Sequence, residues 1–178
     1  SIISDLNTLA SNGSHTGAIS GKLVSSILSN GTSALSSLKT NGSKDLIEIE
    51  AQVPSGQQFD LGAANGIAFA ALLNKTAGKV TVTGNNSVVK GTALEVKALN
   101  TSSADNFQVQ VTGKTNIDDA LIISKMAGIT PTFEKIESAA SELASKLTNT
   151  VLGMATAVTA SNEANVADAK ILSAFTKA

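Results

Sequence analysis

The sequence of 178 residues contains no cysteine, arginine, tryptophan or tyrosine. Without cysteine, the chain cannot form a disulfide, a thiolate nucleophile or a cysteine-ligated zinc or iron–sulfur centre. Proteins that bind nucleic acids usually contact phosphates through arginine and lysine and stack bases on aromatic rings. Because this chain has a formal net charge of −1 and only five aromatic residues, all phenylalanine, we expect no nucleic-acid partner.

Charged residues are also scarce, at 15% of the chain against about a quarter in an average soluble domain. Hydrophobic residues make up 42%, which is enough for a packed core. No apolar run reaches the roughly 18 residues of a membrane-spanning helix, so we expect no transmembrane segment. No basic and then apolar leader opens the sequence, so we expect that any signal peptide was removed or never existed.

The motifs that usually mark catalytic and metal sites are missing or incomplete. His15 is the only histidine, and a zinc ion there would need carboxylates as its remaining ligands. A Ser-x-x-Lys match at residues 36–39 lacks its companion motifs, and the phosphate-loop ending at residues 112–116 has Gln108 where the first glycine belongs. A calcium site over residues 100–106 would have a single carboxylate, that of Asp105. We therefore expect no enzyme activity, no catalytic residue, no bound metal and no cofactor.

Three stretches, at residues 9–14, 28–33 and 38–43, run from leucine through a hydroxyl residue to Asn-Gly and another hydroxyl residue. Glycine just after the last apolar turn is a common helix C-cap, so we interpret these stretches as helix ends. Their asparagines also lie in Asn-x-Ser/Thr sequons, which makes glycosylation the alternative. The candidate acceptors in the whole chain are Asn12, Asn30, Asn41, Asn74, Asn85 and Asn100.

Apolar spacing predicts short helices in the first quarter of the chain, over residues 2–11, 17–29 and 33–39. Residues 47–53 then alternate apolar and polar side chains, which predicts a half-buried strand that stops at Pro54.

A buried helix is expected next, over residues 61–75, because this segment is apolar on nearly every side. Asp60 is placed to cap its N-terminus. Gly62, Gly66 and Ala70 are spaced four residues apart, which favours close backbone packing in a soluble core.

Alternating segments follow at residues 79–83, 87–90, 93–99 and 106–112. Only two to six turn residues separate them, which favours an antiparallel meander with one solvated face. Gly113 is interpreted as the turn that ends the last of these strands.

Helical spacing returns at residues 117–127. Asn116, Asp118 and Asp119 favour the start of this helix, and we interpret the paired aspartates as complements of the helix dipole rather than as an acid–base dyad. Gly128 is placed to end the helix.

Thr130 and Pro131 then predict the start of a long amphipathic helix, since they suit its N-cap and first turn. Glu142 and Lys146 are expected to form an ion pair within it, and Ser161 to cap a final helix. The apolar stripe of the long helix comprises Ile136, Ala140, Leu143, Leu147, Val151, Met154 and Val158, and that of the final helix Val166, Ala169, Ile171, Leu172 and Phe175.

Together these patterns predict a single α+β domain over residues 1–178, because no long proline-rich or charged linker divides the chain. Short N-terminal helices fill residues 1–43. A small antiparallel sheet with one buried helix near residues 60–75 fills residues 44–113, and long C-terminal amphipathic helices fill residues 114–178.

A surface poor in charge and rich in Ser, Thr, Asn, Ala and Gly is frequent among secreted proteins that assemble, such as surface-layer, filament, adhesive or silk, and coat subunits. We therefore predict a non-enzymatic structural protein that self-associates as a homo-oligomer outside the cell or on a particle surface. Contacts between subunits are expected beyond Gly153, whereas the alternative buries the whole stripe within one subunit. The candidate self-association residues are Met154, Val158, Ile171, Leu172 and Phe175.

The second functional hypothesis is a carrier for an apolar small molecule or lipid. The five phenylalanines, the apolar helix around Phe69 and the aliphatic face of the strands could line an internal cavity.

Overall fold

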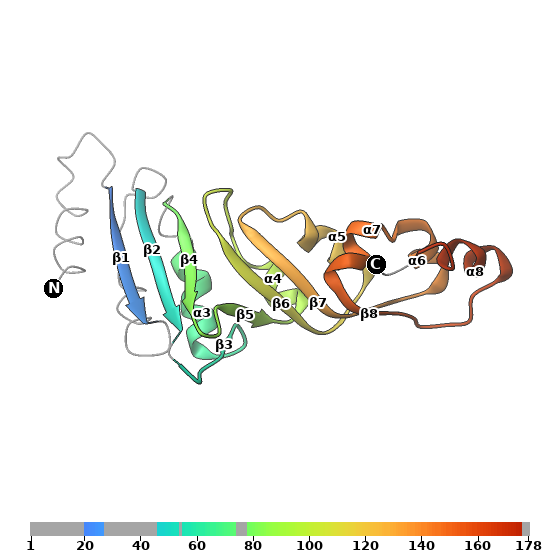
Figure 1. The fold of residues 1–178 in the computed structure, drawn as a ribbon, viewed down its shortest axis with the longest axis horizontal. Helices are drawn as coiled ribbons and strands as arrows, with labels where there is room; N and C mark the ends of the chain where they lie inside the picture. The colour runs from blue at the N-terminus through green and yellow to red at the C-terminus, as the bar shows by residue number, and fades with distance from the viewer. Residues whose placement is uncertain (1–19, 27–45, 54, 74–77, 176–178) are drawn as a thin grey trace.

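Strands and short helices alternate along the chain in the computed structural model, which describes residues 20–26, 46–53, 55–73 and 78–175 (Figure 1). The elements are β1 (Ser20–Ser26), β2 (Leu46–Val53), β3 (Phe59–Asp60), α3 (Ala64–Leu73), β4 (Val80–Gly84), β5 (Val88–Gly91), α4 (Ala93–Lys97), β6 (Phe107–Thr115), α5 (Ile117–Ser124), β7 (Ile129–Ser138), α6 (Ala140–Lys146), α7 (Asn149–Met154), β8 (Ala155–Ala160) and α8 (Val166–Leu172).

Every strand pair in the two sheets is parallel. One sheet has the order β1-β2-β4 and the other β3-β5-β6-β7-β8. Thr81 also bridges to Asn106, which brings the end of the first sheet beside the start of β6. Parallel neighbours need a crossover between them, and from β5 onward short helices provide it.

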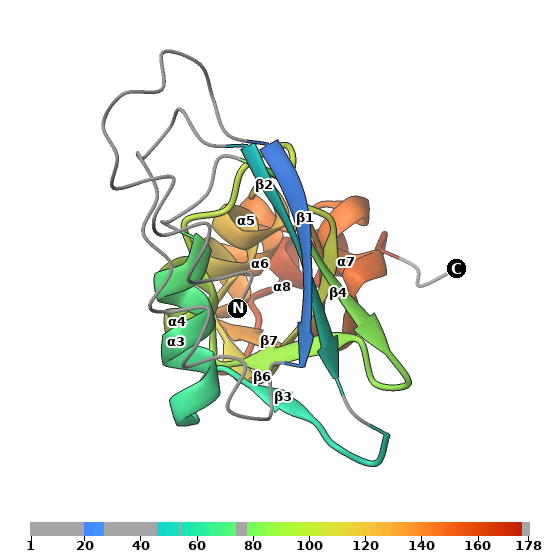
Figure 2. The ribbon, with the colours of Figure 1, turned by 90° about the vertical axis from the view of Figure 1, so that its left-hand side faces the viewer.

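The register shows that the chain winds in successive coils, where a coil is a strand segment together with the helices that follow it. Val109 on β6 pairs with Pro131 on β7, and Phe133 on β7 pairs with Ala155 on β8, a spacing of 22 residues in both cases. The coils stack along the long axis of the molecule from β1 to α8 (Figure 1). Seen end-on, β1, β2 and β4 lie on one side and α3 and α4 on the other (Figure 2). The molecule is therefore a solenoid in which each coil contacts mainly its neighbours.

Equivalent residues of successive coils stack on one another in the core. One row of the register runs through Phe59, Val89, Val109 and Pro131, all of which are buried. Phe69 on α3 packs edge-to-face between Phe59 and Phe107, with ring centroids 5.1 and 5.5 Å away. Fully burying a side chain of this size contributes about 1.5–3 kcal/mol, so such rows are the main source of cohesion between coils.

Polar side chains cap α4, α5, α7 and α8 from within the same coil, and the next coil caps α5 and α6. Asn116 Oδ1 accepts from Asp119 N at 2.8 Å at the start of α5. The next coil adds a second cap, because Ser138 Oγ accepts from Ile117 N at 2.9 Å. At the start of α6, the N-cap Ala139 has no side-chain oxygen, and Asn162 Oδ1 from the following coil accepts from the N–H of the next residue at 2.7 Å.

Ion pairs between the described residues also join neighbouring coils. Lys97 on α4 binds Asp119 on α5, and Lys146 on α6 binds Asp118 on α5 at 2.8 Å. The expected ion pair between Lys146 and Glu142 within one helix is therefore wrong in its partner, since the ammonium hydrogen-bonds to both oxygens of Asp118.

The predicted antiparallel α+β architecture is wrong, because the fold is α/β with parallel strands. The short connections seemed to require hairpins, but residues 93–99, expected to be a strand, contain α4 instead. Thr92 forms a capping box with Glu95, in which Thr92 N donates to Glu95 Oε2 at 2.7 Å. This cap starts a helix and turns the chain back for a parallel crossover.

The predicted long C-terminal helix is also wrong. Its span is divided among β7, α6, α7 and β8. Thr130 and Pro131 lie in β7, where buried Pro131 and Phe133 alternate with exposed Thr130 and Thr132. The backbone of Leu147 turns to an extended conformation and ends α6. The apolar spacing of three and four residues therefore arises from two short helices, α6 and α7, flanked by the strands β7 and β8. The final helix is present, but its N-cap is Asn165, not Ser161.

Three smaller expectations need correction. Residues 20–26 of the expected helix 17–29 form β1. Asp60 belongs to β3 and accepts from Gly62 N at 2.9 Å, whereas α3 begins at Ala64 and leaves Ile67 exposed on its surface. Gly113 lies inside β6, at a register shift, with a positive φ of 70°.

Several expectations are confirmed. Strands are present over most of residues 47–53, 79–83, 87–90 and 106–112, and α5 covers most of the helix expected at 117–127. Close packing at Gly66 is confirmed, since a Cβ there would lie 2.1 Å from the Leu61 backbone. The helices expected at residues 2–11 and 33–39 lie outside the described residues.

Candidate interaction surfaces

The C-terminal coil leaves apolar positions exposed that the earlier coils bury. In α4, α5 and α6, the first and fourth helical residues are buried: Ala93 and Val96, Ile117 and Ala120, Ala140 and Leu143. In α8 the same positions hold Val166 and Ala169, and both are exposed, Val166 by 87%. Ile171 is also 47% exposed. The coil thus carries the apolar pattern of a covered coil without a cover among the described residues.

A small apolar cavity lies between the last two coils. Its volume is about 210 Å³, and it is lined by Leu143, Leu147, Leu152, Val158, Ala160, Leu172 and Phe175. Val158, Leu172 and Phe175 are only partly buried. We call the set Val158, Ala160, Val166, Ile171, Leu172 and Phe175 the end surface.

The strand of this coil is the last of its sheet. Among the described residues β8 pairs with β7 and with no other strand. Its sequence Ala-Thr-Ala-Val-Thr-Ala has neither charge nor proline, the residues with which edge strands usually discourage pairing. The end of the solenoid therefore combines exposed apolar side chains with a strand that, among the described strands, pairs on one side only.

The structure brings together most of the residues that sequence reasoning assigned to self-association. Val158, Leu172 and Phe175 line the same cavity, and Ile171 is exposed on the same helix. Met154, at the end of α7, is half-buried against the core. Val166 and Ala160 were not among the candidates. Aligning Val166 with Ile117 and Ala140 at the starts of the earlier helices would have found it.

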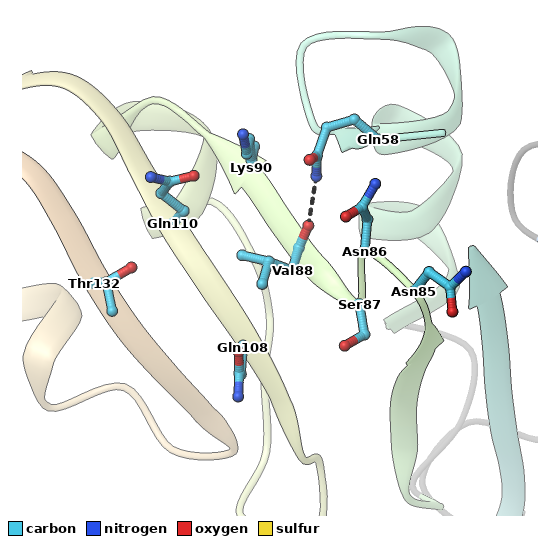
Figure 3. Close-up of a pocket in the computed structure, with 9 residues that line it drawn as sticks. All are labelled: Gln58, Asn85, Asn86, Ser87, Val88, Lys90, Gln108, Gln110 and Thr132. Carbon is cyan, nitrogen blue, oxygen red and sulfur yellow. Dashed lines mark hydrogen bonds between the residues drawn. The ribbon is translucent and has the colours of Figure 1, made fainter. Parts of the chain in front are cut away.

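A polar groove lies on the outer face of the second sheet (Figure 3). Its volume is about 520 Å³, and it is lined by Gln58, Asn85, Asn86, Ser87, Val88, Lys90, Gln108, Gln110 and Thr132. The lining comes from three neighbouring strands, β5, β6 and β7, and from the turns that precede β3 and β5. No acidic residue is among the lining residues. Sequence reasoning missed this groove because it treated the outward polar residues only as a solvated face.

Two charged clusters have ordinary structural roles. Lys114 Nζ donates to Glu137 Oε1 at 2.7 Å, and Lys135 pairs with the other oxygen of Glu137. Hydrogen bonds from these two ammonium groups hold the pKa of the Glu137 carboxyl below its ordinary value. Hydrogen bonding to Asp118 raises the pKa of Lys146.

The Asp105 carboxylate, the single one in the calcium site weighed over residues 100–106, accepts hydrogen bonds from the backbone. Asp105 is buried, and it accepts from Val80 N at 3.0 Å and from Ser102 N at 2.7 Å. No cluster of three acidic or histidine side chains suited to a metal ion is found in the part of the chain that the structure describes. His15 lies outside that part.

Two of the candidate glycosylation sites can be located. Asn85 and Asn100 are exposed in loops, and Asn85 Nδ2 donates to Ser55 Oγ at 3.2 Å. Asn12, Asn30, Asn41 and Asn74 lie outside the described residues. Glycosylation stays a prediction.

The fold and the two surfaces define a class: a parallel α/β solenoid with a polar groove on its sheet face and an apolar end. Within its described residues, no helix has the length and apolar character needed to cross a membrane. No protein-family model, curated protein or solved structure matches the chain.

Proposed function

We propose that this chain is a non-enzymatic structural protein that self-associates through its end surface, outside the cell or on a particle surface. The observation that carries the proposal is the exposure of Val166 at a position that three earlier helices bury. The cost of leaving this apolar surface in water is recovered when another molecule covers it.

A second copy of the same chain is the partner that fits best. The core rows show that coils of this sequence pack on one another with like residues in register. The uncovered apolar positions of one end surface can be covered by the same positions of a second copy. Two copies that meet end surface to end surface, around a twofold axis, would bury both sets of apolar side chains and both β8 edges in one closed contact.

Charge does not oppose this contact. The end surface itself carries no charge, and the nearest charged residues in sequence are Glu163, Asp168, Lys170 and Lys177, of both signs. Long-range repulsion between copies is also weak, because the whole chain has a formal net charge of −1.

The carrier hypothesis has less support. Phe59, Phe69 and Phe107 pack against one another in the interior, so these rings fill the space that a ligand would need. The apolar cavity beside the end surface, about 210 Å³, is smaller than the roughly 300–1,000 Å³ of typical small-molecule sites. A co-purified lipid in native mass spectrometry would favour the carrier over the assembly.

Analytical ultracentrifugation over a concentration series tests the proposal. The wild-type chain is expected to shift from monomer to dimer, and a Val166→Asp/Ile171→Asp variant to remain monomeric. A Leu94→Asp/Ile122→Asp variant is the matched control, since Leu94 and Ile122 are 76% and 54% exposed on helices within the stack. This control should dimerise like the wild type.

Two results would contradict the proposal: a wild-type chain that stays monomeric at every concentration, or a Val166→Asp/Ile171→Asp variant that dimerises normally. Location is tested separately by immunodetection in cell fractions of the source. Protein confined to the cytosolic fraction would overturn the extracellular or particle-surface assignment.

A further inference from the structure

We propose that the polar groove on the sheet face binds an acidic oligosaccharide. This site lies on other strands than the end surface and does not depend on self-association. The argument rests on which groups line the groove, on which of them are already engaged, and on the placement of its one charge.

Primary amides dominate the groove. Gln58, Asn85, Asn86, Gln108 and Gln110 all contribute, and each amide carries both a donor and an acceptor. Sugar hydroxyls also donate and accept at the same atom, so a wall of amides matches a chain of hydroxyls. A peptide main chain or a nucleotide would be matched less well, since the groove offers neither a free strand edge nor more than one cation.

Some of the amides are held in place while others keep their full capacity. Gln58 Nε2 donates to Val88 O at 2.8 Å and Asn86 Nδ2 donates to Gln57 O at 2.9 Å, which fixes these two side chains on one wall (Figure 3). The side chains of Gln108 and Gln110, on β6, make no hydrogen bond to any described residue. They are therefore available to a ligand.

Lys90 supplies the groove with a positive charge. Its side chain is half-buried between these amides and forms no ion pair with a described residue. Asp60 is its neighbour in the β3–β5 register, but one Asp60 oxygen is held by Gly62 N and Asp60 does not line the groove. A sugar carboxylate can give Lys90 the partner that the described residues do not.

The groove also predicts a weak interaction. Among the described residues that line it, none is aromatic, so a sugar ring has no ring to stack on, and Val88 is the one large apolar side chain. We expect a dissociation constant on the order of 1 mM for a short oligosaccharide.

Nuclear magnetic resonance titration suits such an affinity. The probes are a galacturonic acid tetramer and a neutral glucose tetramer of the same length. The acidic tetramer is expected to shift the side-chain amide signals of Gln108 and Gln110, and to bind more tightly than the neutral one. A Gln108→Ala/Gln110→Ala variant should weaken binding about tenfold.

Two matched controls locate the effect. Gln52→Ala removes an exposed amide from the outer face of β2, outside the groove, and should leave binding unchanged. Lys90→Ala should abolish the preference for the acidic tetramer, whereas Lys125→Ala, on the loop after α5, should not. The proposal is overturned if neither tetramer shifts the groove signals, if Gln108→Ala/Gln110→Ala binds like the wild type, or if Lys90→Ala keeps the acidic preference.

Discussion

The helix caps that come from a following coil predict opposite effects on stability for substitutions at Ser138 and Thr115. Ser138 lies 21 residues after Ile117 and Asn162 lies 22 residues after Ala140, and each accepts the first N–H of the helix in the preceding coil. Thr115 lies at a similar sequence distance, 22 residues after Ala93, the first residue of α4, although the strand register pairs it with Ile136 and not with Ser138. Yet Thr115 is buried, and among the described residues its hydroxyl has no hydrogen-bond partner.

Opposite effects follow for two nearly isosteric substitutions. Ser138→Ala leaves the buried N–H of Ile117 without its acceptor, which should lower the free energy of unfolding by about 1–2 kcal/mol. Thr115→Val removes an unpaired buried hydroxyl and should be neutral or stabilising by up to about 1 kcal/mol. The two variants should therefore differ by about 1–3 kcal/mol in the free energy of unfolding.

Urea unfolding followed by circular dichroism measures both changes. Hydrogen exchange adds a local readout, because Ser138→Ala should speed exchange at the Ile117 amide more than at other amides of α5. A destabilised Thr115→Val variant, or a Ser138→Ala variant with wild-type stability, would refute the reasoning about caps between coils.

Three further predictions concern single residues. Gly128→Ala should destabilise the fold by more than about 2 kcal/mol, because Gly128 has a φ of +77° and a Cβ would lie 2.0 Å from Ser102 O. Gly153→Ala, with no atom within 4 Å of its Cβ, should be neutral or stabilise the fold by about 0.5–1 kcal/mol in thermal unfolding. Asp105→Ala should cost about 2–3 kcal/mol in urea unfolding, because two backbone N–H groups lose a charged acceptor. The hydrogen bonds that lower the pKa of Glu137 stabilise the fold fully above the ordinary glutamate pKa, and this stabilisation is lost as the pH falls through the lowered value. Glu137→Gln should therefore flatten the acid side of a plot of unfolding free energy against pH.

Local patterns allowed four of the eight described strands, β2, β4, β5 and β6, to be predicted, because a buried face in a strand requires alternation. The strands β2, β4 and β5 all follow this rule. Their relative direction could not be read in the same way. Alternation is identical in parallel and antiparallel strands, and the five-residue helix α4 was short enough to be mistaken for another strand.

A search for an internal repeat would have corrected the topology. Thr92, Asn116, Ala139 and Asn165 each precede a helix by one residue, and each is followed three positions later by an acidic residue. Single helix caps are common, but four of them spaced by 23 to 26 residues indicate a stacked repeat. The strand-to-strand spacing of 22 residues is the structural counterpart of this pattern.

The two candidate surfaces differ in how far the sequence could predict them. Val158, Leu172 and Phe175 were selected because they are apolar and near one end of the chain, although the long helix assumed to carry Val158 does not exist. They meet because β8 and α8 belong to one coil. The groove could not be predicted, because Gln58 and Gln110 become neighbours only through the parallel register of β3, β5 and β6.

Covalent trapping of the dimer is the most direct test of the central claim that two copies meet at their end surfaces. The chain has no cysteine of its own, so Val166→Cys and Leu94→Cys each introduce a single reactive thiol at an exposed position. With a short bismaleimide at low protein concentration, Val166→Cys should give a covalent dimer and Leu94→Cys should remain monomeric. Equal cross-linking of the two variants, or none for Val166→Cys under conditions where the wild type sediments as a dimer, would contradict it.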